Sequence, residues 1–166
     1  MPLHVVLHRP EIPNNTGNIG RTCVATGAAL HLIHPLGFDT SEKACRRAGL
    51  DYWPRLKLRE HESWEAYTRD ERPARLWVFS TKSQRPVFDA DLRPGDHVVF
   101  GSETAGLPRS ILDAYPDRGL VLPMVASERS LNLATVVCTV LYEAVRQMLV
   151  RGDLELGQDC RWSYPT

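Results

Sequence analysis

Three separate segments of the chain carry polar side chains that are able to hold a ligand, and the first two also contain glycine. They are GNIGR at residues 17–21, FGSETAGLP at 100–108 and LPMVASERSLN at 122–132. Glycine lets a ligand approach the backbone closely, and the neighbouring guanidinium, carboxylate, hydroxyl and amide groups supply hydrogen bonds. The three segments are therefore the candidate site of the chain.

In the first segment, Gly17 and Arg21 are four residues apart and share one face of a predicted helix. Glycine leaves space one turn before the guanidinium, which could hold a phosphate or the edge of a ribose. The alternative interpretation is a surface arginine on an amphipathic helix.

The other two segments each follow an apolar run. Gly101 and Glu103 would place an open backbone and a carboxylate beside a strand end, although a simple strand-to-helix turn has the same composition. Ser130 and Asn132 precede a long apolar helix, where free backbone N–H groups point outward. Helix capping is the alternative role for both.

The elements that must position these segments alternate between apolar strands and helices. We predict strands at 3–7, 30–33, 55–58, 76–79, 97–100 and 120–122, and helices at 17–27, 41–48, 63–69, 108–114 and 131–149. Continuous apolar strands alternating with helices indicate an α/β fold with a mostly parallel sheet covered on both faces. Ligands of such sheets bind outside the carboxyl ends of the strands, where the glycine-bearing segments lie. We expect one domain over residues 1–150 and a tail without regular structure over 151–166.

Composition excludes several classes of protein. The 166 residues carry 20 basic and 20 acidic side chains, which argues against a general nucleic-acid coat protein but permits a local basic patch. The four cysteines have no CxxC spacing, so we expect buried thiols in a reducing cytoplasm. No signal peptide precedes the first strand, and Glu143, Arg146 and Gln147 interrupt the last apolar stretch, so we expect no membrane span. Only His4/His8 and His31/His34 have close spacing, and we predict no metal site.

The three segments together resemble the motifs of the SPOUT class of S-adenosylmethionine-dependent RNA methyltransferases. NNTGNIGR resembles the first motif, FGSETAGLP the second, and LPMVASERSLNLATVVCTVLYEA the third, in the same order over about residues 1–150. Residues 10–21 and 46–53 are similar to the subfamily that 2′-O-methylates the wobble cytidine or uridine of tRNA. The resemblance implies a C-terminal trefoil knot, S-adenosyl-L-methionine as methyl donor, and a homodimer whose active site is completed by the partner chain.

The resemblance also implies roles for individual residues. The methyl donor would contact six residues, namely Phe79, Gly101, Glu103, Leu122, Met124 and Ser130. Three would serve catalysis, namely Arg21, Ser130 and Asn132, and four would bind the RNA, namely Asn15, Arg21, Arg46 and Arg47. Tyr142 and Glu143 match positions at the dimer contact and the cofactor wall.

The positive charge of Arg21 favours an electrostatic role on the developing alkoxide over that of general base, which has been proposed within the family. An RNA patch would combine Arg46 and Arg47 with Arg55, Lys57 and Arg59, and Tyr52 and Trp53 could stack on bases. The alternative is that these are solvated charges and core aromatic residues. Three other functions stay open: methylation of a different tRNA or rRNA nucleotide, RNA and cofactor binding without turnover, and a purely structural dimer.

Overall fold

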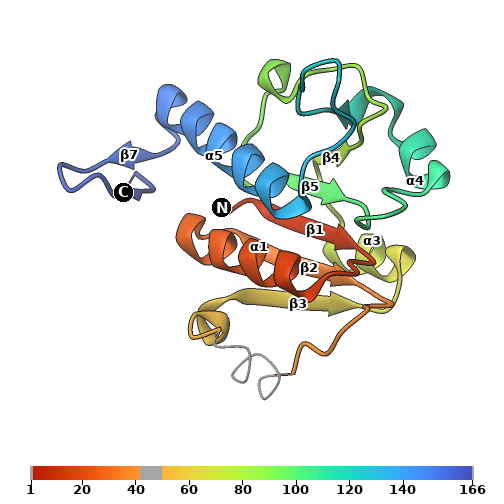
Figure 1. Cartoon of the computed structure of the whole chain (residues 1–166). Coiled ribbons are helices and arrows are strands. Elements are labelled where there is room, and N and C mark those ends of the chain that lie inside the picture. Colours follow the sequence, from red (N-terminus) through yellow and green to blue (C-terminus); the bar gives the residue numbers. More distant parts are fainter. Residues whose placement is uncertain (1, 42–49, 166) are drawn as a thin grey trace.

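A six-stranded sheet forms the centre of the molecule, and every neighbouring pair of its strands is parallel (Figure 1). The computed structural model describes residues 2–41 and 50–165. Along the sheet the strand order is β3-β2-β1-β5-β4-β6. The strands are β1 (His4–His8), β2 (Ala29–Ile33), β3 (Lys57–His61), β4 (Leu76–Phe79), β5 (His97–Phe100) and β6 (Gly119–Leu120). The predicted α/β class with a parallel sheet is confirmed.

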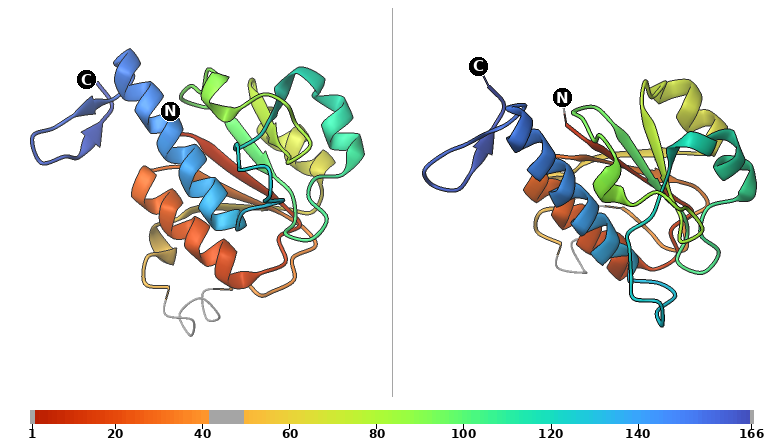
Figure 2. Two further views of the ribbon diagram at one scale, coloured as in Figure 1. Left: turned by 45° about the horizontal axis from the view of Figure 1, so that its top comes forward. Right: turned by 90° about the horizontal axis from the view of Figure 1, so that it is seen from above.

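Helices cover both faces of this sheet (Figure 2). The helices α1 (Pro13–Thr26) and α5 (Leu133–Arg151) pack on one face, where Val5 and Leu7 of β1 meet Ile19 of α1 and Leu141 of α5. The shorter α3 (Trp64–Glu71) and α4 (Arg109–Ala114) cover the other face. Short 3-10 turns complete the chain at η1 (Trp53–Arg55), η2 (Val87–Asp89) and η3 (Pro116–Arg118).

Most element boundaries agree with the sequence to within a few residues, and the differences have local causes. Helix α1 begins at Pro13 rather than at Gly17, because proline has no N–H to lose and its fixed φ suits the first helical position. Residues 55–58 split between η1 and the start of β3. Ser63 caps α3 as predicted, since its side chain accepts a hydrogen bond from Ala66 N. The helix predicted at 41–48 lies largely outside the described residues.

The expectation that residues after Arg151 lack regular structure is wrong. They form an antiparallel hairpin of β7 (Glu155–Leu156) and β8 (Trp162–Ser163). Leu154 is buried, and Trp162 packs against the main core and edge-on to Tyr142 at 6.1 Å between ring centroids. Two apolar anchors without helical or alternating spacing hold this segment, which is why periodicity missed it.

Within the described part of the chain, α5 alone is long and apolar enough to cross a membrane by length and composition. It packs beside α1 and buries Val137, Val140, Leu141, Ala144, Val145 and Met148. Its apolar composition is therefore that of a core helix.

Four histidines from four different strands meet under α3. His31 bonds through both ring nitrogens, at 2.9 Å from His4 Nδ1 and 3.0 Å from His61 Nε2. The Tyr67 hydroxyl lies 2.6 Å from His97 Nδ1. Burial lowers the pKa of His31 to about 2 and that of His97 to about 3. These histidines form a neutral hydrogen-bonded network in the folded chain.

The same cluster contains two sets of three possible metal ligands. They are His4, His31 and His97, and His31, His61 and Glu71, with ligand atoms within 4.8 Å of one another. Spacing along the chain could not reveal them, because the sheet brings together residues that are far apart in sequence. Arg59 Nη1 already engages both carboxylate oxygens of Glu71, at 2.9 and 2.7 Å. The absence of a metal stays a prediction.

The buried histidines predict a stability that falls in mild acid. The unfolded chain binds protons at pKa values near 6.5, whereas folded His31 and His97 do so only near pH 2 and 3. The contribution of these neutral histidines to the free energy of unfolding is therefore fully present above pH 6.5. Below that pH it falls by about 1.4 kcal/mol per pH unit for each histidine. We expect the free energy of unfolding in urea to be about 2–3 kcal/mol lower at pH 5.5 than at pH 7.5.

Two variants test the cause of this pH dependence. His97→Gln, whose side chain can still accept a hydrogen bond from the Tyr67 hydroxyl, should reduce the loss by the contribution of one histidine. His34→Gln changes a partly exposed histidine paired with Glu60 and should leave it unchanged. Equal stability of the wild-type protein at the two pH values would contradict this account.

Candidate functional site

The strand order places the candidate site where the direction of the sheet connections reverses. β1 pairs with β2 on one side and with β5 on the other. The chain therefore leaves β1 and β5 in opposite directions along the sheet. Parallel sheets bind ligands at such a point. The segment after β1 leads into α1, and the segment after β5 is the second glycine-bearing segment.

A carboxylate of the second segment holds the N-terminus of α1. Glu103 accepts hydrogen bonds from Glu11 N at 2.9 Å, from Ile12 N at 3.3 Å and from Asn15 Nδ2 at 3.0 Å. In return, the Glu11 carboxylate accepts bonds from Thr104 N at 3.2 Å and from Thr104 Oγ1 at 2.8 Å. The negative charge of Glu103 also suits the positive end of the helix dipole. The reciprocal bonds lock the start of α1, just before the first segment, to the second segment.

The third segment joins them through Asn132. Its Nδ2 donates to Asn15 Oδ1 at 2.9 Å, while its Oδ1 caps α5 by accepting from Ala134 N and Thr135 N. Helix capping is thus a real role of Asn132, and it fixes the amide that reaches Asn15. Ser130 is exposed and lies two residues before the cap, outside this hydrogen-bonded chain. Asn15, Glu103 and Asn132 therefore bring all three segments together.

Gly101 is required by the fold of its own segment. A Cβ at this position would lie 2.0 Å from Gly106 C and 2.2 Å from Leu107 N. Ser102 and Gly106 form an isolated bridge across the same turn. The sequence interpretation attributed this glycine to close approach of a ligand, whereas here the neighbouring backbone already demands it.

The other residues predicted to contact the methyl donor surround the ends of β4 and β6. Phe79 is buried at the end of β4 and stacks on Phe100 at 4.7 Å. Leu122 and Met124 are partly exposed, and residues from Val125 to Asn132 are exposed. These contacts stay predictions, as does that of Glu103, whose carboxylate is engaged with α1.

Arg21 lies on a different side of α1 from Asn15. Its guanidinium sits 4.3 Å from the centroid of the Tyr52 ring and 3.2 Å from Asp51, and it is 61% exposed. Gly17 faces the same Tyr52, whose hydroxyl donates to the Gly17 carbonyl. Gly17 and Arg21 therefore share a face, as predicted, but this chain does not itself bring Arg21 to Asn132.

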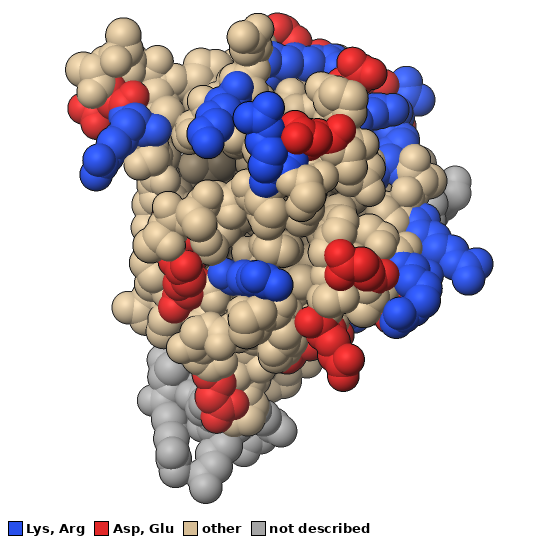
Figure 3. Space-filling view, turned by 90° about the vertical axis from the view of Figure 1, so that its right-hand side faces the viewer, with Lys and Arg blue, Asp and Glu red and all other residues tan. Residues whose placement is uncertain are grey.

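The residues predicted to form an RNA patch are only partly described. Arg46 and Arg47 lie outside the described residues. Arg55, Lys57 and Arg59 belong to η1 and the edge strand β3, and Arg59 pairs with Glu71. Tyr52 is a core residue, as in the alternative interpretation. On the side toward which the strands point, positive and negative side chains are interspersed (Figure 3). This agrees with zero net charge.

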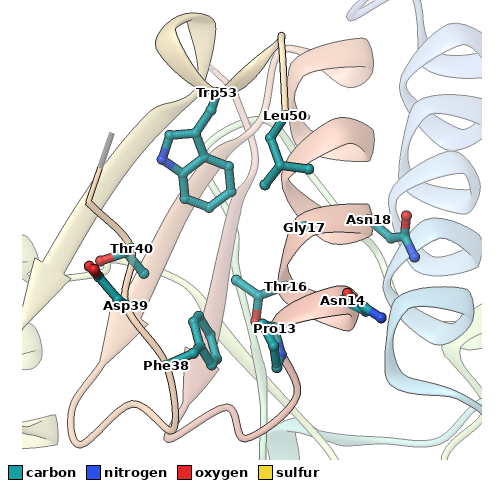
Figure 4. Close-up of a pocket in the computed structure, with 10 residues that line it drawn as sticks. All are labelled: Pro13, Asn14, Thr16, Gly17, Asn18, Phe38, Asp39, Thr40, Leu50 and Trp53. Carbon is teal, nitrogen blue, oxygen red and sulfur yellow. The ribbon is translucent and has the colours of Figure 1, made fainter. Parts of the chain in front are cut away.

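Sequence reasoning missed a cavity that lies beside the first turns of α1 (Figure 4). Its volume is about 250 Å³, and ten residues line it: Pro13, Asn14, Thr16, Gly17, Asn18, Phe38, Asp39, Thr40, Leu50 and Trp53. Phe38 and Trp53 come from segments distant from α1. Trp53 was noted for stacking, but nothing in the sequence pattern pointed to Thr16 or Phe38.

Comparison with known proteins identifies the family. The model of the SpoU rRNA methylase family matches residues 2–142 of this chain. The chain belongs to the SpoU rRNA methylase family. This SpoU protein is 45% identical over 151 residues to the tRNA (cytidine(34)-2′-O)-methyltransferase of Saccharophagus degradans, covering 90% of this chain and 98% of the relative. It is 46% identical over 147 residues to the enzyme of the same name from Escherichia coli K12, covering 88% and 94%.

Solved structures agree with this membership. A structure described as giving insights into the 2-OH methylation of C/U34 on tRNA has a TM-score of 0.83 and 46% identity, covering 90% of the SpoU chain and 97% of its own. The SpoU methyltransferase AviRb from Streptomyces viridochromogenes, solved with AdoMet, has a TM-score of 0.75 and 29% identity, covering 90% of this chain and 61% of its own.

Proposed function

We propose that this SpoU protein transfers a methyl group from S-adenosyl-L-methionine to the ribose 2′-hydroxyl of the wobble cytidine or uridine of tRNA. The observation that carries the proposal is the joining of the three motif segments through Asn15, Glu103 and Asn132. Relatives named tRNA (cytidine(34)-2′-O)-methyltransferase, at 45–48% identity over about 90% of the chain, support the substrate. They favour tRNA over the rRNA target in the family's description.

The third segment fits a donor that is held by backbone groups. Within the described residues, the backbone of 122–131 makes a single backbone–backbone hydrogen bond, from Glu128 N to Val125 O. Its remaining N–H and C=O groups follow the end of β6, the strand that pairs with β4, and are free to pair with the polar atoms of a ligand. Phe79, Gly101, Leu122, Met124 and Ser130 would hold the donor there, with Glu103 fixing the adjoining turn.

S-adenosyl-L-methionine supplies an electrophilic methyl group on a sulfonium. The chain must therefore align a weak ribose nucleophile and exclude water, and positioning can account for much of the rate. Arg21 would stabilise the oxygen as it loses its proton. Asn132, fixed by Asn15 and by its capping bonds, would orient the sugar, and Ser130 would act beside it.

We further propose a homodimer in which Arg21 of one protomer acts beside the second and third segments of the other. These two segments, which would hold the methyl donor, are called the donor segments. Within one chain Arg21 contacts Tyr52 and Asp51 whereas Asn132 contacts Asn15, so a complete site would take its guanidinium from a second chain. Exposed apolar side chains on and around α5 suit such a contact, namely Ile12, Val125, Leu131, Tyr142 and Val150. Glu143 is held on its own helix by Arg146 and Gln147. A trefoil knot in the C-terminal part and a cytoplasmic location belong to the same proposal.

Substrate binding would add Arg46 and Arg47, which flank the segment that supports Arg21. Positive side chains near the anticodon loop act on phosphates and release counterions. Asn15 would contribute to substrate binding through its hydrogen bond to Asn132.

Nucleoside mass spectrometry tests the proposed function. Purified protein is incubated with S-adenosylmethionine and unmodified tRNA, and ribonuclease fragments are mapped. We expect one added methyl group on the ribose of position 34. A methyl group at another nucleotide, or on a base, would overturn the substrate assignment. Donor binding without methyl transfer would support the binding module instead.

A further inference from the structure

We propose that the cavity beside α1 binds the base of the nucleotide whose ribose is methylated. The inference rests on the proposed function and names the part of the protein that recognises the target base. Figure 4 shows Trp53 and Phe38 at opposite ends of this cavity, with α1 forming one wall. A space of about 250 Å³ bounded by aromatic rings suits a flat heterocycle, since bases of single-stranded RNA stack on such side chains.

Among the residues that the structure describes, the charges around the cavity favour a neutral base over a phosphate. Neither lysine nor arginine is among the described residues that line it, and Asp39 contributes a carboxylate. Hydrogen bonds from the Ser41 backbone and hydroxyl hold the pKa of Asp39 below its usual value, so this charge persists at neutral pH. The amides of Asn14 and Asn18, on the side of α1 that faces α5 in Figure 4, mark the rim of the cavity rather than the space between the two aromatic rings.

Thr16 is a second and independent indication of a ligand. Its Oγ1 is buried and has no hydrogen-bond partner among the described residues, and Thr16 lines the cavity. A buried hydroxyl left without a partner destabilises the folded chain. A base in the cavity would supply the missing partner once rotation of the Thr16 side chain turns this hydroxyl toward it.

The cavity adjoins Arg21 through a shared segment. Leu50 and Trp53 line the cavity, while Asp51 and Tyr52, between them in sequence, contact the Arg21 guanidinium. Along α1, Gly17 at the cavity precedes Arg21 by one turn, or about 6 Å. A ribose attached to a base in the cavity would therefore lie beside the residue proposed to act on its hydroxyl.

Two substitutions separate a binding role from a structural one. Thr16→Val keeps the shape and removes the unpartnered hydroxyl, so it should raise the melting temperature. Gly17→Ala places a Cβ at ordinary contact distance, 3.6 Å from Leu50 Cδ2 and Tyr52 Oη, and it favours the helix. Both should impair methylation while leaving the fold as stable or more stable. Thr26→Val is the matched control, because the Thr26 hydroxyl donates to the Thr22 and Cys23 carbonyls of α1 itself.

The decisive experiment compares two anticodon stem-loops, one with cytidine at position 34 and one with an abasic ribose there. Loss of base stacking in Phe38→Ala should lower kcat/KM for the cytidine loop about 5- to 150-fold. It should leave kcat/KM for the abasic loop unchanged, and Thr16→Val and Gly17→Ala should show the same selectivity. Thr26→Val should match the wild-type protein on both loops.

Three results would overturn the inference. Equal losses on the two loops would show that the cavity does not read the target base. Sensitivity of the variants to an abasic residue at position 33 or 35 instead would assign the cavity to a neighbouring base. A wild-type protein that methylates neither loop would contradict the proposed function itself. This outcome can be told from failure of the inference, because it is seen with the wild-type protein before any variant is compared.

Discussion

Replacement of Arg21 by alanine is expected to lower kcat for methyl transfer about 100- to 1,000-fold. This is the usual effect of removing one preorganised hydrogen-bonding group that stabilises a developing oxyanion. The affinity for S-adenosylmethionine in calorimetry should not change, because Arg21 is proposed to act on the ribose oxygen and its guanidinium is held by Tyr52 and Asp51 of its own protomer. Arg109, an exposed arginine paired with Asp113 on α4, provides the control in Arg109→Ala.

The Arg21→Lys variant separates the two roles considered for this residue. Lysine keeps the positive charge, so an electrostatic role predicts turnover between that of the wild-type protein and that of Arg21→Ala. Complete loss of turnover in Arg21→Lys with normal donor binding would favour a general base and contradict the electrostatic role.

The second large effect is expected at Gly101. Alanine would place its Cβ 2.0 Å from Gly106 C, so the backbone of the second segment must move. This movement would also displace Glu103, which holds the N-terminus of α1. Because a shift of about 1 Å can cost about 100-fold in rate, we expect Gly101→Ala to lower methyl transfer by about that factor and to weaken donor binding in calorimetry.

Gly106→Ala is the matched control in the same turn. Its Cβ would meet nothing within 4 Å, but its φ of +69° is unfavourable for alanine. The cost should be limited to about 1 kcal/mol of strain, with donor binding retained. Wild-type donor affinity in Gly101→Ala would show that this turn does not shape the cofactor site.

The two inactive variants together test whether the site is shared between protomers. In a mixed dimer, the Gly101→Ala protomer still supplies Arg21, and the Arg21→Ala protomer still supplies intact donor segments. If Arg21 acts across the interface, exchange of equal amounts should restore about a quarter of the wild-type activity, from one working site in half of the dimers. No recovery after verified subunit exchange would place Arg21 and the donor in one protomer.

The sequence predicted the sheet well because its strands are short, apolar and bounded by turn residues. The runs at β4 and β5 match the predicted strands at both ends. It also pointed to Glu103 and Asn132, since parallel strands present their ends at one edge. It could not predict that Glu103 meets Asn15, 88 residues away, because such contacts depend on strand order.

Other features were hidden for similar reasons. The histidine cluster and the cavity collect residues from distant elements, and neither has a spacing that a motif could record. The hairpin after Arg151 depends on Leu154 and Trp162, two anchors without periodicity. Position along the chain also could not show that Arg21, which shares α1 with Asn15, faces Tyr52.

The most direct test of the account uses two anticodon stem-loops that differ by a single oxygen. One carries cytidine at position 34 and the other carries 2′-deoxycytidine there, and both are incubated with the protein and S-adenosylmethionine labelled in its methyl group. The account predicts close to one methyl group per loop on the ribose substrate and none on the deoxy substrate. Equal labelling of the two loops would contradict it, because the methyl group would then be going to an atom other than the ribose 2′-oxygen of the wobble nucleotide.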